Sequence, residues 1–224
     1  MSKPRHIAEN FKVGALLSFV GGYLDTYTYI CRDGVFANAQ TGNIVLMGLR
    51  LTEREFRGAV HYLIPILSFV IGVIAVELIK SRFNDDPKVH WHQLTLIIEM
   101  AVLAVVGFIP NTRNDLANVL VSLTCAMQVE GFRRLNGNAY ATTMCTGNLR
   151  SGSESLFNYL RAKDKNELHK SLSYFGIIGI FIIGAAVGAV ITRIVGLKAV
   201  FFCIIGQGLA LALLMTNKVH ATHK

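Results

Sequence analysis

Charged residues are scarce in this sequence. Asp, Glu, Lys and Arg make up only 16% of the 224 residues, whereas 52% are hydrophobic. A typical soluble domain is about 25% charged and does not contain apolar runs as long as those found here. The composition therefore excludes an ordinary soluble domain and indicates an integral membrane protein whose first partner is the lipid bilayer.

Signatures of catalysis and of metal binding are missing as well. The sequence contains no HExxH, GxSxG or P-loop motif, and its four cysteines form no CxxC pair and no metal-ligand spacing. Gly22-Tyr23-Leu24-Asp25 distantly resembles the motif of an intramembrane aspartyl protease. Such an enzyme needs a second Asp on a facing span, where this chain offers Glu130. We therefore expect no enzyme, no catalytic residue, no metal and no cofactor.

Basic residues outnumber acidic ones and give a net charge of +8. They lie in the loops and termini between apolar runs, which is typical of the positive-inside rule and not of a nucleic-acid platform, so we expect no nucleic-acid partner. Lys3, Arg5 and Lys12 resemble the start of a signal peptide. Asp25 interrupts the apolar run that follows, and no small-residue cleavage site is present, so we expect an uncleaved first span.

Long apolar runs predict six membrane spans. About twenty residues at 1.5 Å each cover the roughly 30 Å hydrocarbon core. The spans are expected near residues 12–31, 60–80, 94–109, 116–134, 171–192 and 198–216. A helix over 41–51 reaches only about half of a bilayer, and one over 146–162 is amphipathic. We predict an all-α, polytopic transmembrane helix bundle with about six full spans and two short broken or re-entrant helices.

An internal repeat is visible in the spacing of polar residues. An acidic residue inside an apolar run is followed, sixteen residues later, by a Thr-Gly-Asn tripeptide, and this arrangement occurs twice. The two copies are Asp25 with Thr41-Gly42-Asn43, and Glu130 with Thr146-Gly147-Asn148. We therefore predict two repeats, over residues 1–111 and 112–224. If both short helices are re-entrant, the repeats are inverted.

Charge also predicts the topology. With six crossings and the N-terminus inside, most Lys and Arg residues lie on the cytoplasmic side, and the C-terminus is cytoplasmic too. With eight crossings, in which both short helices span the membrane, the same bias is weaker. Gly184-x-x-x-Gly188 in the span near 171–192 is a motif for close contact with another helix.

Acidic side chains within the spans are candidate functional residues, because each costs roughly 2.5–3.5 kcal/mol to insert. Asp25 and Glu130 either bind a solute or ion, or act as structural locks that pair with Arg133, Arg134 or backbone amides. Glu99 is either a proton carrier or a buried, hydrogen-bonded acid. The sequence leaves both alternatives open.

The two Thr-Gly-Asn segments have the chemistry of a binding site at a broken helix. Thr41 is a candidate N-cap, Gly allows close approach of backbone or ligand, and Asn offers both a donor and an acceptor. The N-terminus of a half-helix carries a partial positive charge, and such breaks hold the substrate in many transporters. The alternative is an ordinary helix cap. The candidate substrate- or ion-binding residues are Asp25, Gln40, Thr41, Gly42, Asn43, Glu99, Glu130, Thr146, Gly147 and Asn148.

Three segments resemble the YoaK family of uncharacterised multi-pass bacterial membrane proteins. They are Gly22-Tyr23-Leu24-Asp25, Val35-Phe36-Ala37-Asn38-Ala39-Gln40-Thr41-Gly42-Asn43 and Ser68-Phe69-Val70-Ile71-Gly72. The likeness covers essentially the whole chain, and the second half matches the pattern more loosely. The resemblance implies about six spans and a bacterial inner (cell) membrane. It supplies no substrate and no reaction.

The residues themselves favour a small-solute transporter or channel with a central site at the two Thr-Gly-Asn breaks. The alternative is a non-transporting membrane module, such as a sensor, a lipid-interacting protein or an assembly partner. A sensor normally needs a soluble output domain, and we expect none from this sequence. The sequence leaves open the identity of the solute or ion, its coupling and direction, and assembly into a homo-oligomer.

Overall fold

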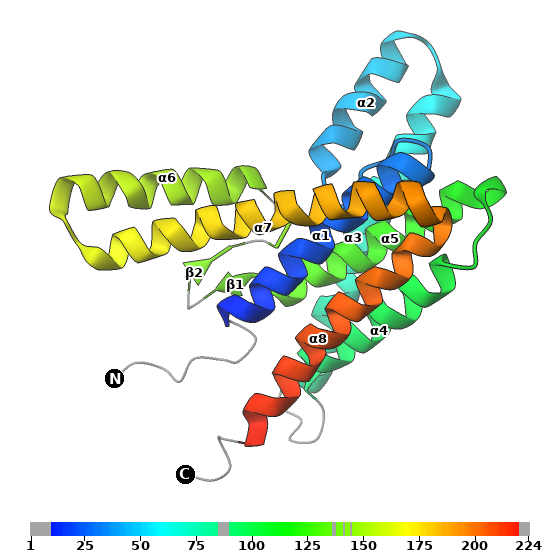
Figure 1. Cartoon of the computed structure of the whole chain (residues 1–224). Coiled ribbons are helices and arrows are strands. Elements are labelled where there is room, and N and C mark those ends of the chain that lie inside the picture. Colours follow the sequence, from blue (N-terminus) through cyan, green and yellow to red (C-terminus); the bar gives the residue numbers. More distant parts are fainter. Residues whose placement is uncertain (1–9, 85–89, 136–137, 141, 144, 220–224) are drawn as a thin grey trace.

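A computed structural model of the chain describes residues 10–84, 90–135, 138–140, 142–143 and 145–219, and most of these residues are helical (Figure 1). The helices are α1 (Phe11–Cys31), α2 (Gln40–Thr52), α3 (Phe56–Phe83), α4 (Trp91–Val106), α5 (Asn114–Gly131), α6 (Cys145–Ala162), α7 (Lys165–Val195) and α8 (Val200–Val219). Two 3-10 turns, Asn111–Arg113 and Gly196–Ala199, precede α5 and α8. The strands β1 (Arg134–Leu135) and β2 (Asn138–Ala139) form a short antiparallel pair between α5 and α6.

Local sequence signals set the ends of two long helices. The side-chain oxygen of Asn10 accepts a hydrogen bond from the Lys12 N–H at 2.9 Å and caps α1. Asp164 caps α7 in the same way, through the Asn166 N–H at 2.9 Å. Both are residue types that favour the N-cap position. Helix α7 is terminated by its C-cap residue Gly196, whose φ of +60° is a conformation that glycine adopts without strain.

The first helix of each half packs against the other half of the chain. Helix α1 lies along α7 and also contacts α8, and α5 lies along α3 and also contacts α4. The short helices stay within their own halves, α2 on α3 and α6 on α7. In Figure 1, α1 runs toward α2, α5 runs in the opposite sense, and the α2–α3 and α6–α7 hairpins project from different ends of the bundle.

Glycines make these long contacts close. A Cβ atom added at Gly184 would lie 2.1 Å from the carbonyl oxygen of Phe19 on α1. A Cβ atom at Gly72 would lie 2.5 Å from the carbonyl oxygen of Leu123 on α5. Gly188 similarly lies against the backbone of Tyr23. Two helices can approach this closely only where the side chain is missing, as the Gly184-x-x-x-Gly188 pattern predicts.

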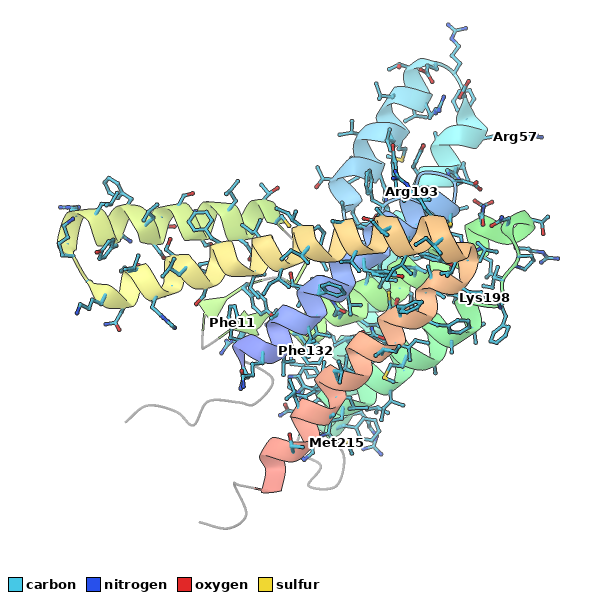
Figure 2. The ribbon with its side chains drawn as sticks, in the orientation of Figure 1. Phe11, Arg57, Phe132, Arg193, Lys198 and Met215 are labelled. Carbon is cyan, nitrogen blue, oxygen red and sulfur yellow. The ribbon has the colours of Figure 1, made fainter. Side chains whose placement is uncertain are left out.

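A buried arginine closes one end of the core. Arg32, at the end of α1, is fully buried and donates hydrogen bonds to the Tyr27 hydroxyl, to the carbonyls of Val106 and Ile109, and to the side chain of Asn114. It therefore joins α1 to the ends of α4 and α5. Lys198, labelled in Figure 2 at the turn between α7 and α8, contacts the same region by donating to the carbonyl of Gly107 at 2.9 Å.

Helices occur over all six ranges where the sequence predicts spans and over both ranges where it predicts short helices. Two stretches are both long and apolar enough to cross a membrane: Phe56–Phe83, which is α3, and Lys165–Thr216, which contains α7 and most of α8. Helix α4 is apolar but shorter. Ile74, Ile182 and Ile205, on α3, α7 and α8, are each more than half exposed. Such outward apolar faces are typical of helices in contact with lipid.

Candidate functional site: a cavity between the first turns of α2 and α6

The first turns of the two short helices meet at one cavity of about 710 Å³. Its walls also include parts of α1, α3, α5 and α7, so both halves of the chain contribute. Six of the ten residues that the sequence singles out lie in its lining: Asp25, Gln40, Thr41, Glu130, Thr146 and Gly147. Pockets of roughly 300–1,000 Å³ are typical of sites that enclose a small organic ligand.

Asp25 lies in the cavity wall but also holds the start of α2. Its side chain is only 7% exposed, and its Oδ1 accepts a hydrogen bond from the backbone N–H of Asn38 at 2.7 Å. The N-cap residue of α2 is Ala39, which has no side chain that could cap the helix. The expectation that Thr41 is the N-cap is wrong, because Thr41 is the second residue of the helix and is exposed. The carboxylate from α1 satisfies an amide at this helix start instead.

Glu130 occupies a different position, although it stands at the same sequence distance from its Thr-Gly-Asn segment. It lies in the last turn of α5 and forms an ion pair with Arg133 at 3.0 Å. Asp25, by contrast, lies nearly two turns before the end of α1. Counting back from the end of each helix, Cys125 stands where Asp25 stands. The difference arises because the α5–α6 connection, residues 132–144, is longer than the α1–α2 connection, residues 32–39.

The Gly and Asn of the first tripeptide lie behind the cavity lining. Asn43 is fully buried, donates to the carbonyl of Phe36 at 2.7 Å and accepts from the Phe36 N–H at 3.2 Å. A Cβ atom at Gly42 would come within 3.0 Å of the Phe36 ring. Both residues therefore fix the loop that leads into α2. In the second copy, Asn148 is also buried, but Gly147 has no atom of the described residues within 4 Å of its Cβ position and lies open to the cavity.

Glu99 is not part of this site. Its side chain is fully buried between α4 and α8, where its Oε2 accepts a hydrogen bond from Gln207 Nε2 at 2.8 Å. The structure therefore separates Glu99 from the other sequence candidates. Within the described residues, no three His, Cys, Asp or Glu side chains come together as a metal site.

The aromatic walls of the cavity are not among the site residues predicted from the sequence. Phe69 on α3 and Phe181 on α7 both line it, each followed four residues later by a small apolar lining residue, Val73 or Ala185. The signal was present as two similar runs of five residues, Phe-Val-Ile-Gly-Val at 69–73 and Phe-Ile-Ile-Gly-Ala at 181–185. It is hidden because such runs are common in apolar helices and carry no polar residue. The glycine within each run is the one that contacts the facing helix.

Comparison with known proteins adds family information to this geometry. The family model described as "Protein of unknown function (DUF1275)" matches residues 13–214. Among curated proteins, the "UPF0700 transmembrane protein YoaK" of Bacillus subtilis (strain 168) is 24% identical over 157 residues, covering 68% of this chain and 70% of that protein. No solved structure matches the chain significantly.

Proposed function

The chain belongs to the DUF1275 family, and on that premise we propose that this membrane protein moves a small solute through the cavity between α2 and α6. The observation that carries the proposal is the meeting of two helix starts, one from each half, at a single cavity of about 710 Å³. The free amides at the start of a helix are ready hydrogen-bond donors, and transporters commonly bind their substrates between such broken helices.

We further propose that the two halves are an inverted repeat. The helix pairs support this: α1 with α7 and α8 corresponds to α5 with α3 and α4, and α2 with α3 corresponds to α6 with α7. The ends of α1 and α5 are also alike, since Arg32 has φ and ψ of −133° and 48° and Phe132 has −124° and 51°. Arg54 and Lys163, in the two hairpin turns, both have φ near +60°.

An inverted repeat provides a simple route for transport. If α3 and α7 exchange their conformations, the cavity opens toward one side of the membrane in one state and toward the other side in the second state. The short helices α2 and α6 are the natural moving parts, because α2 packs chiefly on α3 and α6 chiefly on α7, each within its own half. Phe69 and Phe181 occupy corresponding places on the two long helices, so either ring can close one side of the cavity.

The topology follows from charge. We propose six crossings, with α2 and α6 re-entrant, in a bacterial inner membrane. Arg161, Lys163 and Lys165 lie at the turn between α6 and α7 and favour the cytoplasmic side for it, together with both termini. The turn between α2 and α3 then lies outside.

Labelling tests this topology. In a cysteine-free background, Ala162→Cys should react with an impermeant thiol reagent only from the cytoplasmic side, and Thr52→Cys only from outside. Both positions are exposed last residues of their helices, so reactivity reports the side of the membrane and not burial. Reaction of both from one side would rule out the inverted arrangement.

Blocking the cavity tests transport itself. Gly147 lines the cavity and Gly48, on α2, is not among its described lining residues, yet in the part of the chain that the structure describes neither has an atom within 4 Å of its Cβ position. We expect Gly147→Trp to abolish solute-dependent swelling of proteoliposomes, measured by light scattering with a panel of sugars, polyols, amino acids and amines. Gly48→Trp is the matched control and should keep it. If the wild-type protein gives no more swelling than empty liposomes with every solute, the protein is a non-transporting membrane module.

A further inference from the structure

The cavity between α2 and α6 is acidic. Asp25 and Glu130 are both in its lining, and the described lining residues include no Lys, Arg or His. Arg133, the ion-pair partner of Glu130, is not in the lining, and its side chain is 58% exposed. Solvent therefore screens this partner more strongly than it screens Glu130, whose side chain is 15% exposed.

The N-termini of α2 and α6 do not make the electrostatic potential inside the cavity positive. Each helix N-terminus is equivalent to about half a positive charge, so two of them supply about one charge against two carboxylates. The α2 terminus is in addition already engaged by Asp25, through the Asn38 N–H. An anion inside the cavity would face the carboxylates of Asp25 and Glu130 without a basic side chain in the described lining to pair with, whereas a cation would be stabilised.

Aromatic rings form much of the remaining wall. Tyr29 and Phe36 are stacked, with ring centroids 4.9 Å apart and planes at 22°, and both line the cavity. Phe69 and Phe181 line it from α3 and α7. Aromatic faces attract cations by about 0.5–2 kcal/mol each, most strongly where water is excluded, and they also solvate apolar groups.

One polar side chain of the cavity wall is able to accept a hydrogen bond from a donor on the solute. Thr143 is in the lining, and its hydroxyl is buried and has no hydrogen-bond partner among the described residues. Such a hydroxyl can accept a hydrogen bond from an ammonium group, which is a donor only. The wall thus combines negative charge, aromatic faces and an unused acceptor.

Resting on the function proposed above, we infer that the solute is a small organic cation with an apolar body, of the amine or quaternary ammonium class. The carboxylates attract its charge, the four rings enclose its body, and the absence of basic residues from the described lining disfavours anions. A bare metal ion fits less well, because it would require several converging oxygen ligands in place of aromatic rings.

A pair of probes with the same shape and opposite charge tests the inference. Binding of tetraphenylphosphonium and of tetraphenylborate to the purified full chain is measured by equilibrium dialysis, and cavity binding is defined as the part that Gly147→Trp removes and Gly48→Trp retains. We expect the cation to bind the cavity at least tenfold more tightly than the anion. Phe69→Leu and Phe181→Leu should each weaken cation binding about threefold to tenfold. Phe108→Leu, which changes an exposed ring outside the lining, should leave it unchanged.

Charge variants provide a second measurement. Glu130→Gln should weaken cation binding and leave tetraphenylborate binding equal or stronger, whereas Glu53→Gln, at the exposed α2–α3 turn, should affect neither probe. Equal or tighter cavity binding of the anion would overturn the cation class but keep the cavity as a binding site. Swelling with neutral solutes alone, without cavity binding of the cation, would overturn the cation class and keep transport. Absence of both swelling and cavity binding would overturn the inference and the proposed function together.

Discussion

The two connections that lead into the cavity have the same starting geometry but different anchors. The first begins at Arg32, which is fully buried and bonded to four polar groups on α1, α4 and α5 or near their ends. The second begins at Phe132, which is equally buried but packs in an apolar cluster that includes Leu17 and Leu96. The backbone dihedrals at the two residues agree within about 10°. The same helix end is therefore held by hydrogen bonds in one half and by apolar packing in the other.

The two connections are therefore more alike in backbone geometry at their starts than in side-chain chemistry. The carboxylates differ in the same way, since Asp25 bonds an amide at the start of α2 while Glu130 pairs with the exposed Arg133. In the second half, Gln128 links the helix to its connection, donating to the Thr142 hydroxyl at 3.1 Å. We infer that the first connection is the more rigid of the two and the more sensitive to substitution.

Replacing the two anchors, Arg32 and Phe132, should produce the largest difference in stability between the two connections. Arg32→Met removes a donor that serves several buried acceptors, and each acceptor left unpaired costs about 1–3 kcal/mol. Phe132→Leu keeps an apolar side chain in an apolar cluster and should cost about 1 kcal/mol. We expect Arg32→Met to lower stability by about 3 kcal/mol or more, measured by thermal unfolding in detergent. Comparable losses for both variants would show that the two connections are equally anchored.

The next effect should be the same in both halves. Gly72→Ala and Gly184→Ala each place a methyl group against a backbone carbonyl, at 2.5 Å and 2.1 Å before relaxation. Overpacking of this kind costs about 1–3 kcal/mol. Gly179→Ala is the control and should be neutral or stabilising, because no atom of the described residues lies within 4 Å of the Cβ position of Gly179 on α7. A loss at Gly184 alone would argue that the α3–α5 contact is not the counterpart of the α1–α7 contact.

Much of the fold could be predicted from the sequence, because apolar runs and their interruptions are governed by helix length and hydration. Helices occur at all the expected ranges, and their ends shift by a few residues, for example to Asn114–Gly131 where 116–134 was expected. The cavity lining also includes three of the six Thr-Gly-Asn residues, namely Thr41, Thr146 and Gly147. Helix ends shift because caps and tertiary contacts decide the last turn.

The remaining features required three-dimensional information. Asp25 and Glu130 stand at the same sequence distance from their Thr-Gly-Asn segments, which predicts equivalent positions. Glu130 lies closer to the end of its helix than Asp25 does, and the longer second connection makes the two sequence distances equal. In the sequence, Arg32 belongs to a short polar segment that ends the first span. Only the fold reveals the carbonyls of Val106 and Ile109 around it. Glu99 has no spacing signal that could separate it from the cavity, since its partner Gln207 is far away in the chain.

The smallest predicted effect concerns the two carboxylates. Asp25→Asn keeps an acceptor for the Asn38 N–H but removes the charge, and hydrogen bonds to charged groups are worth roughly 1 kcal/mol more than neutral ones. Glu130→Gln breaks an ion pair whose arginine is 58% exposed, and pairs of this kind contribute little, so we expect a change within about 0.5 kcal/mol. Thermal unfolding in detergent of the two variants, each compared with Glu53→Gln at an exposed ion pair, measures the difference. If Glu130→Gln is the more destabilising variant, the second connection depends on its ion pair, and the greater rigidity assigned to the first connection is wrong.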